Sequence, residues 1–380
     1  WFLRCLLNVA QCSSVGTCYT RAEMKDGFMP HTIKNSFYKH LTFENLLSAH
    51  LRAKKQKAKK CEVLRFELNL ENNLVNLLNK LKNGTYHVGN YRIFYINEPK
   101  LRKIEALPYV DRIVHQWYVE EFIKPNIVPK FINSSCACIV GRGCHKAADI
   151  IQHDMKVYKR KNPNYWILKC DIRKFFYSID PNILFSIVKK YMSDKKLIQF
   201  THQLIFENRK DPIGIPIGNY TSQFFANIYL NELDQYIKHT LRVKYYVRYM
   251  DDFVMLLEDK ETCKTYKKLI EEFVENKLHL SLNQKSRYYP AAQGLNFCGY
   301  RIWPTHRLLR KSSKTKIKRK IRKWNKIWLR GDLDFGIVMP SLQSWLAHAN
   351  HCNTYKLKCK VLNSAEFLYN DKKEYPVRID

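Results

Sequence analysis

Short apolar runs of strand character alternate with longer helical patterns through most of the chain. The apolar runs, which are rich in β-branched and aromatic residues, are 165–170, 244–248, 254–257, 280–285 and 295–301. Apolar positions that recur every three or four residues predict helices over 181–192, 195–206, 221–241 and 261–277. Strands and helices in this order predict an α+β fold, in which helices cover one face of a sheet.

The flanks of this pattern are more helical. On the N-terminal side, helices are predicted over 42–60, 70–82 and 110–123, and the second should stop at Asn83-Gly84. A hairpin is predicted between them, with strands 91–96 and 100–104. On the C-terminal side, helical regions are predicted over 311–326 and 342–362.

The net charge of the chain indicates what kind of partner it binds. Among 380 residues, 66 Lys and Arg face 34 Asp and Glu, which gives a net charge of +32. Such an excess predicts a polyanionic partner, and nucleic acid is the first candidate. A membrane is the weaker interpretation, since no basic amphipathic anchor stands apart and no apolar run reaches transmembrane length.

The twelve cysteines are scattered and no pair has the CxxC spacing of a zinc site. They fit the reduced thiols of a cytosolic protein. The first 23 residues suggest no function and are expected to form an N-terminal extension of unknown role.

Three carboxylates carry the candidate chemistry. Asp251 and Asp252 lie between two strand-like runs, at the predicted tip of a hairpin, where Asp is also common for purely local reasons. Asp171 ends an earlier apolar run, and pairing of the two strands would bring all three acids together. Such a cluster is unfavourable without a cation, and its oxygen ligands suit Mg²⁺. Two such ions support nucleotidyl transfer.

Basic side chains near the predicted 91–104 hairpin leave two interpretations open. They could clamp a triphosphate through charge-assisted hydrogen bonds. They could equally be exposed lysines that protect a strand edge, and without further context this second interpretation is favoured.

Several motifs, taken in order, resemble those of reverse transcriptases over roughly residues 40 to 360. The motifs are Arg102, Asp171 with Phe176, Ile217-Gly218 with Ser222-Gln223, Tyr249-Met250-Asp251-Asp252, Lys285 and Phe297-Cys298-Gly299-Tyr300. The resemblance implies a right-hand polymerase fold of fingers, palm and helical thumb. The implied boundaries are 24–163 for the fingers with the start of the palm, 164–304 for the palm with a fingers insertion at about 181–218, and 305–380 for the thumb and C-terminal tail.

The resemblance also implies roles for individual residues. Asp171, Asp251 and Asp252 would hold two Mg²⁺ ions, or Mn²⁺ as a substitute, with the backbone carbonyl of Ile172 as a further ligand. The residues expected to contact the incoming nucleotide are Lys100, Arg102, Phe176, Ile217 and Lys285. Among them, Phe176 would be the steric gate that excludes a 2′-hydroxyl. The primer grip would be Cys298, Gly299 and Tyr300.

One departure from the usual motif points to a subgroup. Most relatives carry Gln-Gly where this chain has Ile217-Gly218, and the form Ile-Gly-x-x-x-Ser-Gln resembles the enzymes of diversity-generating retroelements. Segment 344–355 also resembles the thumb of that group. Ile217 cannot hydrogen-bond the nucleotide sugar, and such a bond is worth about 1 kcal/mol, enough to weaken selectivity several-fold.

The resemblance therefore implies an error-prone, RNA-directed DNA polymerase of a prokaryotic cytoplasm. Its partners would be dNTPs, a structured template RNA with its RNA/cDNA duplex, and a small basic helical accessory protein. One alternative is an antiphage defence reverse transcriptase that copies a dedicated noncoding RNA. Another is a non-catalytic RNA-binding scaffold, against which the intact carboxylates and Phe176 argue.

Overall fold

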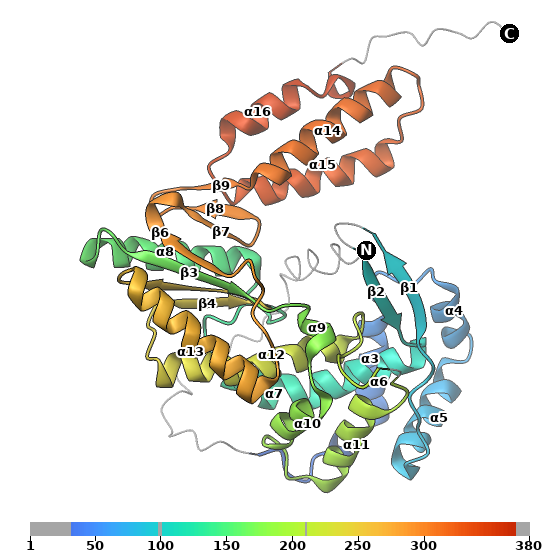
Figure 1. Cartoon of the computed structure of the whole chain (residues 1–380). Helices are drawn as coiled ribbons and strands as arrows, with labels where there is room; N and C mark the ends of the chain where they lie inside the picture. The colour runs from blue at the N-terminus through green and yellow to red at the C-terminus, as the bar shows by residue number, and fades with distance from the viewer. Residues whose placement is uncertain (1–31, 98–100, 210, 370–380) are drawn as a thin grey trace, which may run out of the picture. The chain divides into compact units, whose positions relative to one another are not determined.

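The computed structural model describes residues 32–97, 101–209 and 211–369 (Figure 1). Lys100 and the N-terminal extension lie outside these residues. The chain divides into two compact units, which are described separately. One unit contains the residues up to Gly143 together with Lys169–Val254 and Lys264–Arg287. The other contains Cys144–Leu168, Met255–Cys263 and the residues from Tyr288 onward.

Helices build most of the first unit, and most of them bury an apolar face. They are α2 (Phe37–His40), α3 (Phe43–Lys54), α4 (Cys61–Glu67), α5 (Leu70–Asn83), α6 (Tyr109–Tyr118), α7 (Lys124–Asn126), α9 (Phe175–Ser178), α10 (Pro181–Lys189), α11 (Lys195–Phe206), α12 (Tyr220–Gln235) and most of α13 (Lys260–Leu278). As predicted, α5 stops at Gly84, whose φ of 71° closes the helix. In α6 and the π-helical turn Val119–Ile123 that follows it, Ile113, Trp117 and Phe122 are fully buried.

The predicted hairpin is also present. Strand β1 (Arg92–Ile96) pairs antiparallel with β2 (Arg102–Ala106), and Ile96 faces Arg102 in the register. The backbone N–H of Glu105 donates to the carbonyl of Ile217 at 2.9 Å. The hairpin is therefore fixed to the loop that precedes α12.

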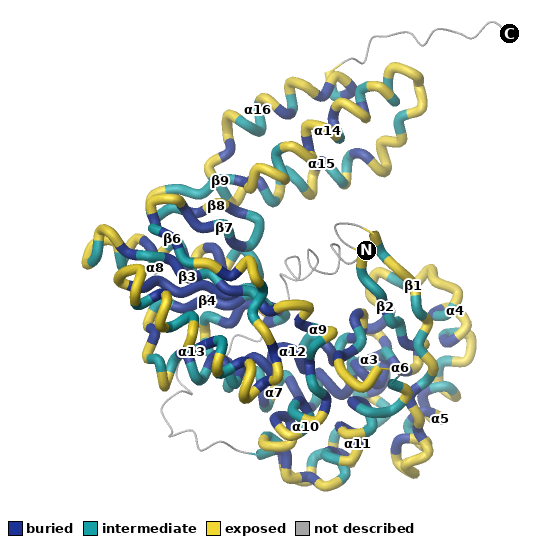
Figure 2. The backbone as a smooth tube through the Cα atoms, viewed as in Figure 1, coloured by how far each residue is buried: buried dark blue, intermediate teal, exposed yellow. Residues whose placement is uncertain are grey.

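A four-stranded sheet in the order β4-β5-β3-β6 carries the predicted carboxylates. Its strands are β3 (Trp166–Asp171), β4 (Tyr246–Tyr249), β5 (Asp252–Leu257) and β6 (Arg287–Pro290). The inner strands are largely buried, which fits their nearly continuous apolar sequence (Figure 2). The expected α+β fold class is confirmed.

The second unit contains α8 (Cys144–Lys161), a three-stranded antiparallel sheet and a helical subdomain. The sheet consists of β7 (Leu295–Phe297), β8 (Tyr300–Ile302) and β9 (Arg307–Leu309). The subdomain consists of α14 (Lys311–Trp328), α15 (Phe335–Asn350) and α16 (Tyr355–Asn363), which lie side by side around Ile317, Ile321 and Leu342 (Figure 1). No helix in the described parts of the chain is long and apolar enough to cross a membrane.

Four element predictions were wrong in detail. Segment 280–285 is not a strand but contributes one bridge, between Leu282 and Ile172. Segment 295–301 is a hairpin, because Cys298 and Gly299 adopt φ values of 47° and 86° and reverse the chain. The helix predicted over 42–60 ends early, at Lys54, and the helical region predicted over 342–362 is divided in two after Asn350. The described residues thus form three separate sheets rather than one.

Candidate active site

Two neighbouring strands bring the predicted carboxylates to one end of the four-stranded sheet. Asp171 is the last residue of β3 and Asp252 the first of β5, and these strands are adjacent. The backbone N–H of Ile172 donates to the carbonyl of Asp251 at 3.3 Å, which joins the ends of the two segments. The sequence analysis expected this juxtaposition if the two strand-like runs pair.

The turn before β5 depends on a buried arginine. Met250 has a φ of 56°, an uncommon conformation for a residue with a side chain, so the turn needs support. The Arg248 guanidinium donates to the Met250 carbonyl at 2.9 Å and pairs with the Asp234 carboxylate at 2.6 Å. Both charged side chains are fully buried. The ion pair therefore anchors the backbone that presents Asp251.

Asp171 is oriented by a segment far along the chain. The Asn283 side-chain amide donates to Oδ2 of Asp171 at 2.8 Å, and the Asn283 backbone N–H donates to the Asp171 carbonyl at 2.7 Å. The hydroxyl of Ser286 accepts from the Asp171 backbone N–H at 3.1 Å. These contacts restrict both the backbone and the carboxylate of Asp171.

The charge balance of the site is uneven. Burial raises the pKa of Asp251 to about 6, with the nearby negative charges of Asp171 and Asp252 adding to the effect and Arg102 opposing it. Asp252 is neutralised by Lys169, whose Nζ lies 2.8 Å from Oδ2. A cation bound beside Asp251 would therefore favour the ionised form of this carboxylate.

The donor set fits a hard divalent cation, because three carboxylates supply only oxygen ligands. Asp171, Asp251 and Asp252 would hold it. Within the described ranges, however, no three His, Cys, Asp or Glu side chains are arranged as a ready-made metal site. In this conformation Lys169 and Asn283 contact carboxylate oxygens of Asp252 and Asp171.

The residues predicted to contact a nucleotide lie on three segments. Arg102 begins β2, and Phe176 is partly buried in α9, five residues after Asp171. Ile217 is buried, and the following Gly218 has a φ of 125°. A Cβ on Gly218 would lie 3.1 Å from the Ile104 side chain, so glycine permits the close approach of this loop to β2.

Other predicted residues have more limited contacts. Lys285 is exposed, and its backbone N–H donates to Oδ1 of Asn283 at 3.1 Å. In the second unit, Cys298 and Gly299 form the β7–β8 turn, whereas the Tyr300 side chain is fully buried. Any primer contact of the Cys298–Tyr300 segment would therefore involve the turn rather than the Tyr300 ring.

Sequence reasoning missed the residues that support the carboxylates. Lys169 had a usable signal, because it lies two residues before Asp171 and so projects from the same face of β3. Arg248 also had one, since a charged residue within an apolar strand needs a buried partner. Nothing local to Asn283 predicted its contact with Asp171.

Residues 81–302 match the family model described as reverse transcriptase (RNA-dependent DNA polymerase). The chain is 23% identical over 305 residues to the group II intron-encoded protein LtrA of Lactococcus lactis subsp. cremoris, covering 61% of this chain and 50% of that protein. It is 21% identical over 201 residues to the putative COX1/OXI3 intron 2 protein of Saccharomyces cerevisiae, covering 36% of this chain and 24% of that one.

A solved structure, apo telomerase from Candida tropicalis, shares 13% identity and a TM-score of 0.47 over 79% of this chain and 63% of that one. The chain spans about half the length of the Lactococcus relative. The family match itself covers more than half of the 380 residues and includes all three carboxylates. This chain belongs to the reverse transcriptase family.

Proposed function

We propose that this chain is an RNA-directed DNA polymerase that acts through Asp171, Asp251 and Asp252. The observation that carries the proposal is the adjacency of β3 and β5, which gathers these carboxylates at one sheet end in a chain of net charge +32. Bound Mg²⁺ would activate the primer 3′-hydroxyl and stabilise the leaving pyrophosphate. Fingers, palm and thumb are proposed with the boundaries given above.

The side chains around the carboxylates prepare them for this role. Asn283 and Ser286 hold Asp171 in one orientation, and the Arg248–Asp234 pair holds the turn that carries Asp251. Asp251 must lose its proton to act as a ligand, and its raised pKa of about 6 still allows this at neutral pH. Arg102, whose charge acts on Asp251, is proposed to contact the incoming triphosphate, with Lys100 and Lys285 as further cations.

Selection of the nucleotide is assigned to two side chains. Phe176 would exclude the 2′-hydroxyl of a ribonucleotide. Ile217 offers only hydrocarbon where a hydrogen-bonding residue would favour the correctly paired nucleotide. We propose, on the Ile217-Gly218 motif, that the enzyme is of the error-prone, diversity-generating type.

The proposed partners follow the charge of the chain. Helix α14 carries nine basic residues between 311 and 326, most of them exposed, while Ile317, Ile321 and Trp324 face its core. An RNA/cDNA duplex and a structured template RNA fit such a surface because it neutralises phosphates. A small basic helical accessory protein is proposed from the family resemblance alone.

The test is primer extension on an RNA template with Mg²⁺ and dNTPs, comparing the wild type with Asp251→Ala/Asp252→Ala. The matched control is Glu271→Ala/Glu272→Ala, which removes two adjacent acids from α13, where each forms only an i,i+4 ion pair. Extension should be lost in the first variant and retained in the second. If primer extension survives loss of both aspartates, the polymerase proposal is wrong.

Sequencing of the products tests the subtype. Errors concentrated opposite template adenines, and reduced by Ile217→Gln, support the diversity-generating role. Faithful copying by the wild type contradicts that role and favours a defence function.

A further inference from the structure

We propose that Gly214 is a positioning residue for sugar selection, because it lets the loop 211–216 brace the backbone that carries Phe176. The inference rests on the proposed function, since it assumes that Phe176 excludes the 2′-hydroxyl. It assigns to this loop a role in discriminating dNTPs from rNTPs.

The first observation is a pair of backbone hydrogen bonds. The N–H of Ile215 donates to the carbonyl of Phe176 at 2.7 Å, and the N–H of Gly214 donates to the carbonyl of Ile179 at 2.8 Å. The two carbonyls belong to α9 and to the residue that ends it. The loop thus holds this short helix from one side.

The second observation is that a side chain at position 214 would crowd the backbone of α9. A Cβ there would lie 3.1 Å from both Cα and the carbonyl oxygen of Tyr177, and 3.2 Å from the carbonyl oxygen of Phe176. These atoms are backbone, so they cannot move aside without displacing α9. Gly214 also has a φ of 99°, which residues with side chains rarely adopt.

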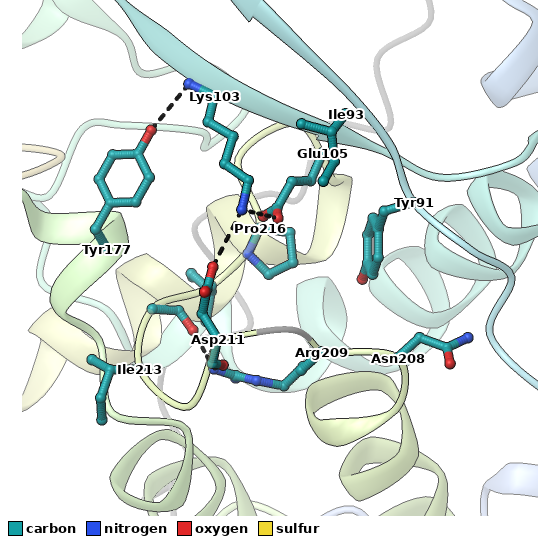
Figure 3. Close-up of a pocket in the computed structure, with 12 residues that line it drawn as sticks. Tyr91, Ile93, Lys103, Glu105, Tyr177, Asn208, Arg209, Asp211, Ile213 and Pro216 are labelled. Carbon is teal, nitrogen blue, oxygen red and sulfur yellow. Dashed lines mark hydrogen bonds and ion pairs between the residues drawn. The ribbon is translucent and has the colours of Figure 1, made fainter.

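The third observation is that the loop is itself rigidly held. Nη2 of Arg209 donates to the carbonyls of Gly214, Asp211 and Pro212 at 2.7, 3.0 and 3.3 Å. Figure 3 shows the Arg209 side chain running beneath the loop. One guanidinium therefore satisfies three loop carbonyls and fixes their spacing.

The fourth observation is a set of contacts that join the loop 211–216 and α9 to the β1–β2 hairpin. Nζ of Lys103 lies 2.9 Å from Glu105 and 3.2 Å from Asp211, and the Lys103 backbone N–H donates to the Tyr177 hydroxyl at 3.3 Å (Figure 3). Strand β2, which also carries Arg102, is thereby joined to both the loop and α9. The strand that carries Arg102, the proposed triphosphate contact, and the helix that carries Phe176, the proposed steric gate, are therefore held by the same contacts.

A displacement of α9 changes where the Phe176 ring meets the sugar. The gate has to exclude only one hydroxyl oxygen, so a shift of α9 by a few tenths of an ångström is sufficient to weaken it. We expect Gly214→Ala to lower the ratio of kcat/KM for dNTP over rNTP about tenfold, through slower dNTP incorporation and faster rNTP incorporation.

Gly141→Ala is the matched control. Gly141 also has a positive φ, of 73°, but nothing lies within 4 Å of the position of its Cβ. It therefore reproduces the backbone strain of an alanine at positive φ without the crowding. The dNTP/rNTP ratio of this variant should equal that of the wild type.

A double-mutant cycle separates positioning from general damage. If Gly214 acts through the gate, Gly214→Ala should leave the ratio unchanged in a Phe176→Ala background. If Gly214→Ala does not fold, Arg209→Lys removes the forked donor and Asp211→Asn weakens the exposed Lys103 contact, and both should lower the ratio.

The outcomes distinguish the two proposals. The inference is overturned if the wild type is active and folded Gly214→Ala has the dNTP/rNTP ratio of the wild type. It is also overturned if Gly214→Ala lowers that ratio equally in the wild-type and Phe176→Ala backgrounds. Either result leaves the polymerase proposal intact. Absence of any synthesis that depends on Asp251 refutes the proposed function, and the inference with it.

Discussion

Arg248 and Asp234 form an ion pair at 2.6 Å in which both side chains are fully buried. Asp234 also accepts from the Tyr246 hydroxyl at 2.6 Å, and Arg248 donates to the Asn227 side chain at 3.1 Å. The negative charge of Asp234 raises the pKa of Arg248 further despite burial. The pair is thus fully satisfied by hydrogen bonds, which is the condition under which buried charges are tolerated.

Asp234→Asn should lower the free energy of unfolding by about 3–5 kcal/mol, because it leaves the Arg248 charge buried without its counter-ion. The measurement is chemical denaturation. Lys190→Met, which breaks the exposed pair with Glu232, is the control and should cost at most about 1 kcal/mol. Equal effects of the two substitutions would contradict this account of the turn.

Asn283→Ala should raise the Mg²⁺ concentration needed for half-maximal primer extension by about ten- to a hundredfold, as expected when a group that orients a metal ligand is lost. The reason is the 2.8 Å hydrogen bond from Asn283 to Asp171. Asn72→Ala, which removes an exposed bond to Asn69, should leave the Mg²⁺ dependence unchanged. An unaltered Mg²⁺ requirement in Asn283→Ala would show that Asp171 needs no such support.

Asp251 should make the metal-free protein less stable as the pH rises. Its pKa of about 6 in the folded chain exceeds the ordinary value of 3.8, so folding favours the protonated form. The contribution of protonated Asp251 to the free energy of unfolding is fully present below about pH 4 and is lost as the pH rises through about 6. Asp251→Asn should therefore stabilise the protein by about 1–3 kcal/mol at pH 7.5 and by much less at pH 4.

Denaturation in EDTA at both pH values tests this expectation, with the exposed Asp332→Asn as the control. The same ionisation predicts that kcat/KM for extension rises with pH through about 6 in the wild type. If the difference in stability between Asp251→Asn and the wild type does not change with pH, the repulsion at the site comes from groups other than Asp251.

Tyr300→Phe should lower the free energy of unfolding by about 1–2 kcal/mol, since two partly buried hydrogen bonds are lost. The Tyr300 hydroxyl contacts Nδ1 of His145 at 2.7 Å and Nδ1 of His348 at 3.1 Å. Tyr355→Phe is the control, because Tyr355 is 77% exposed, and its effect should stay within about 0.5 kcal/mol. Thermal unfolding followed by circular dichroism provides the comparison.

Local patterns predicted the elements well where one physical cause dominated. The glycine stop after α5 and the N-caps of α10 and α11, where Asp180 and Asp194 accept backbone hydrogen bonds, are readable within a few residues. The position of Asp171 beside the 251–252 turn was also expected, because pairing of the two strand-like runs that carry these acids would bring them together.

Contacts between segments that are distant in sequence were not predictable in the same way. Segment 280–285 has the alternation of a strand, yet its backbone instead bridges Ile172 and closes on Asp171. Nothing near Gly214 in the sequence indicates its role, since its crowding comes from Tyr177, which is distant in sequence. Such features depend on which segments meet, and that is settled by tertiary packing rather than by propensity.

The partners of Asp171 at Asn283 and Ser286 lie 112 and 115 residues further along the chain. A ribosome exposes all three carboxylates well before it exposes these partners, and domains fold as their segments emerge. Asp171, the proposed metal ligand, thus acquires its fixed orientation only once α13 and the segment after it have been synthesised. An incomplete nascent chain would contain the three acids but not the contacts that orient Asp171, so under the proposed function a prematurely released chain should be inactive.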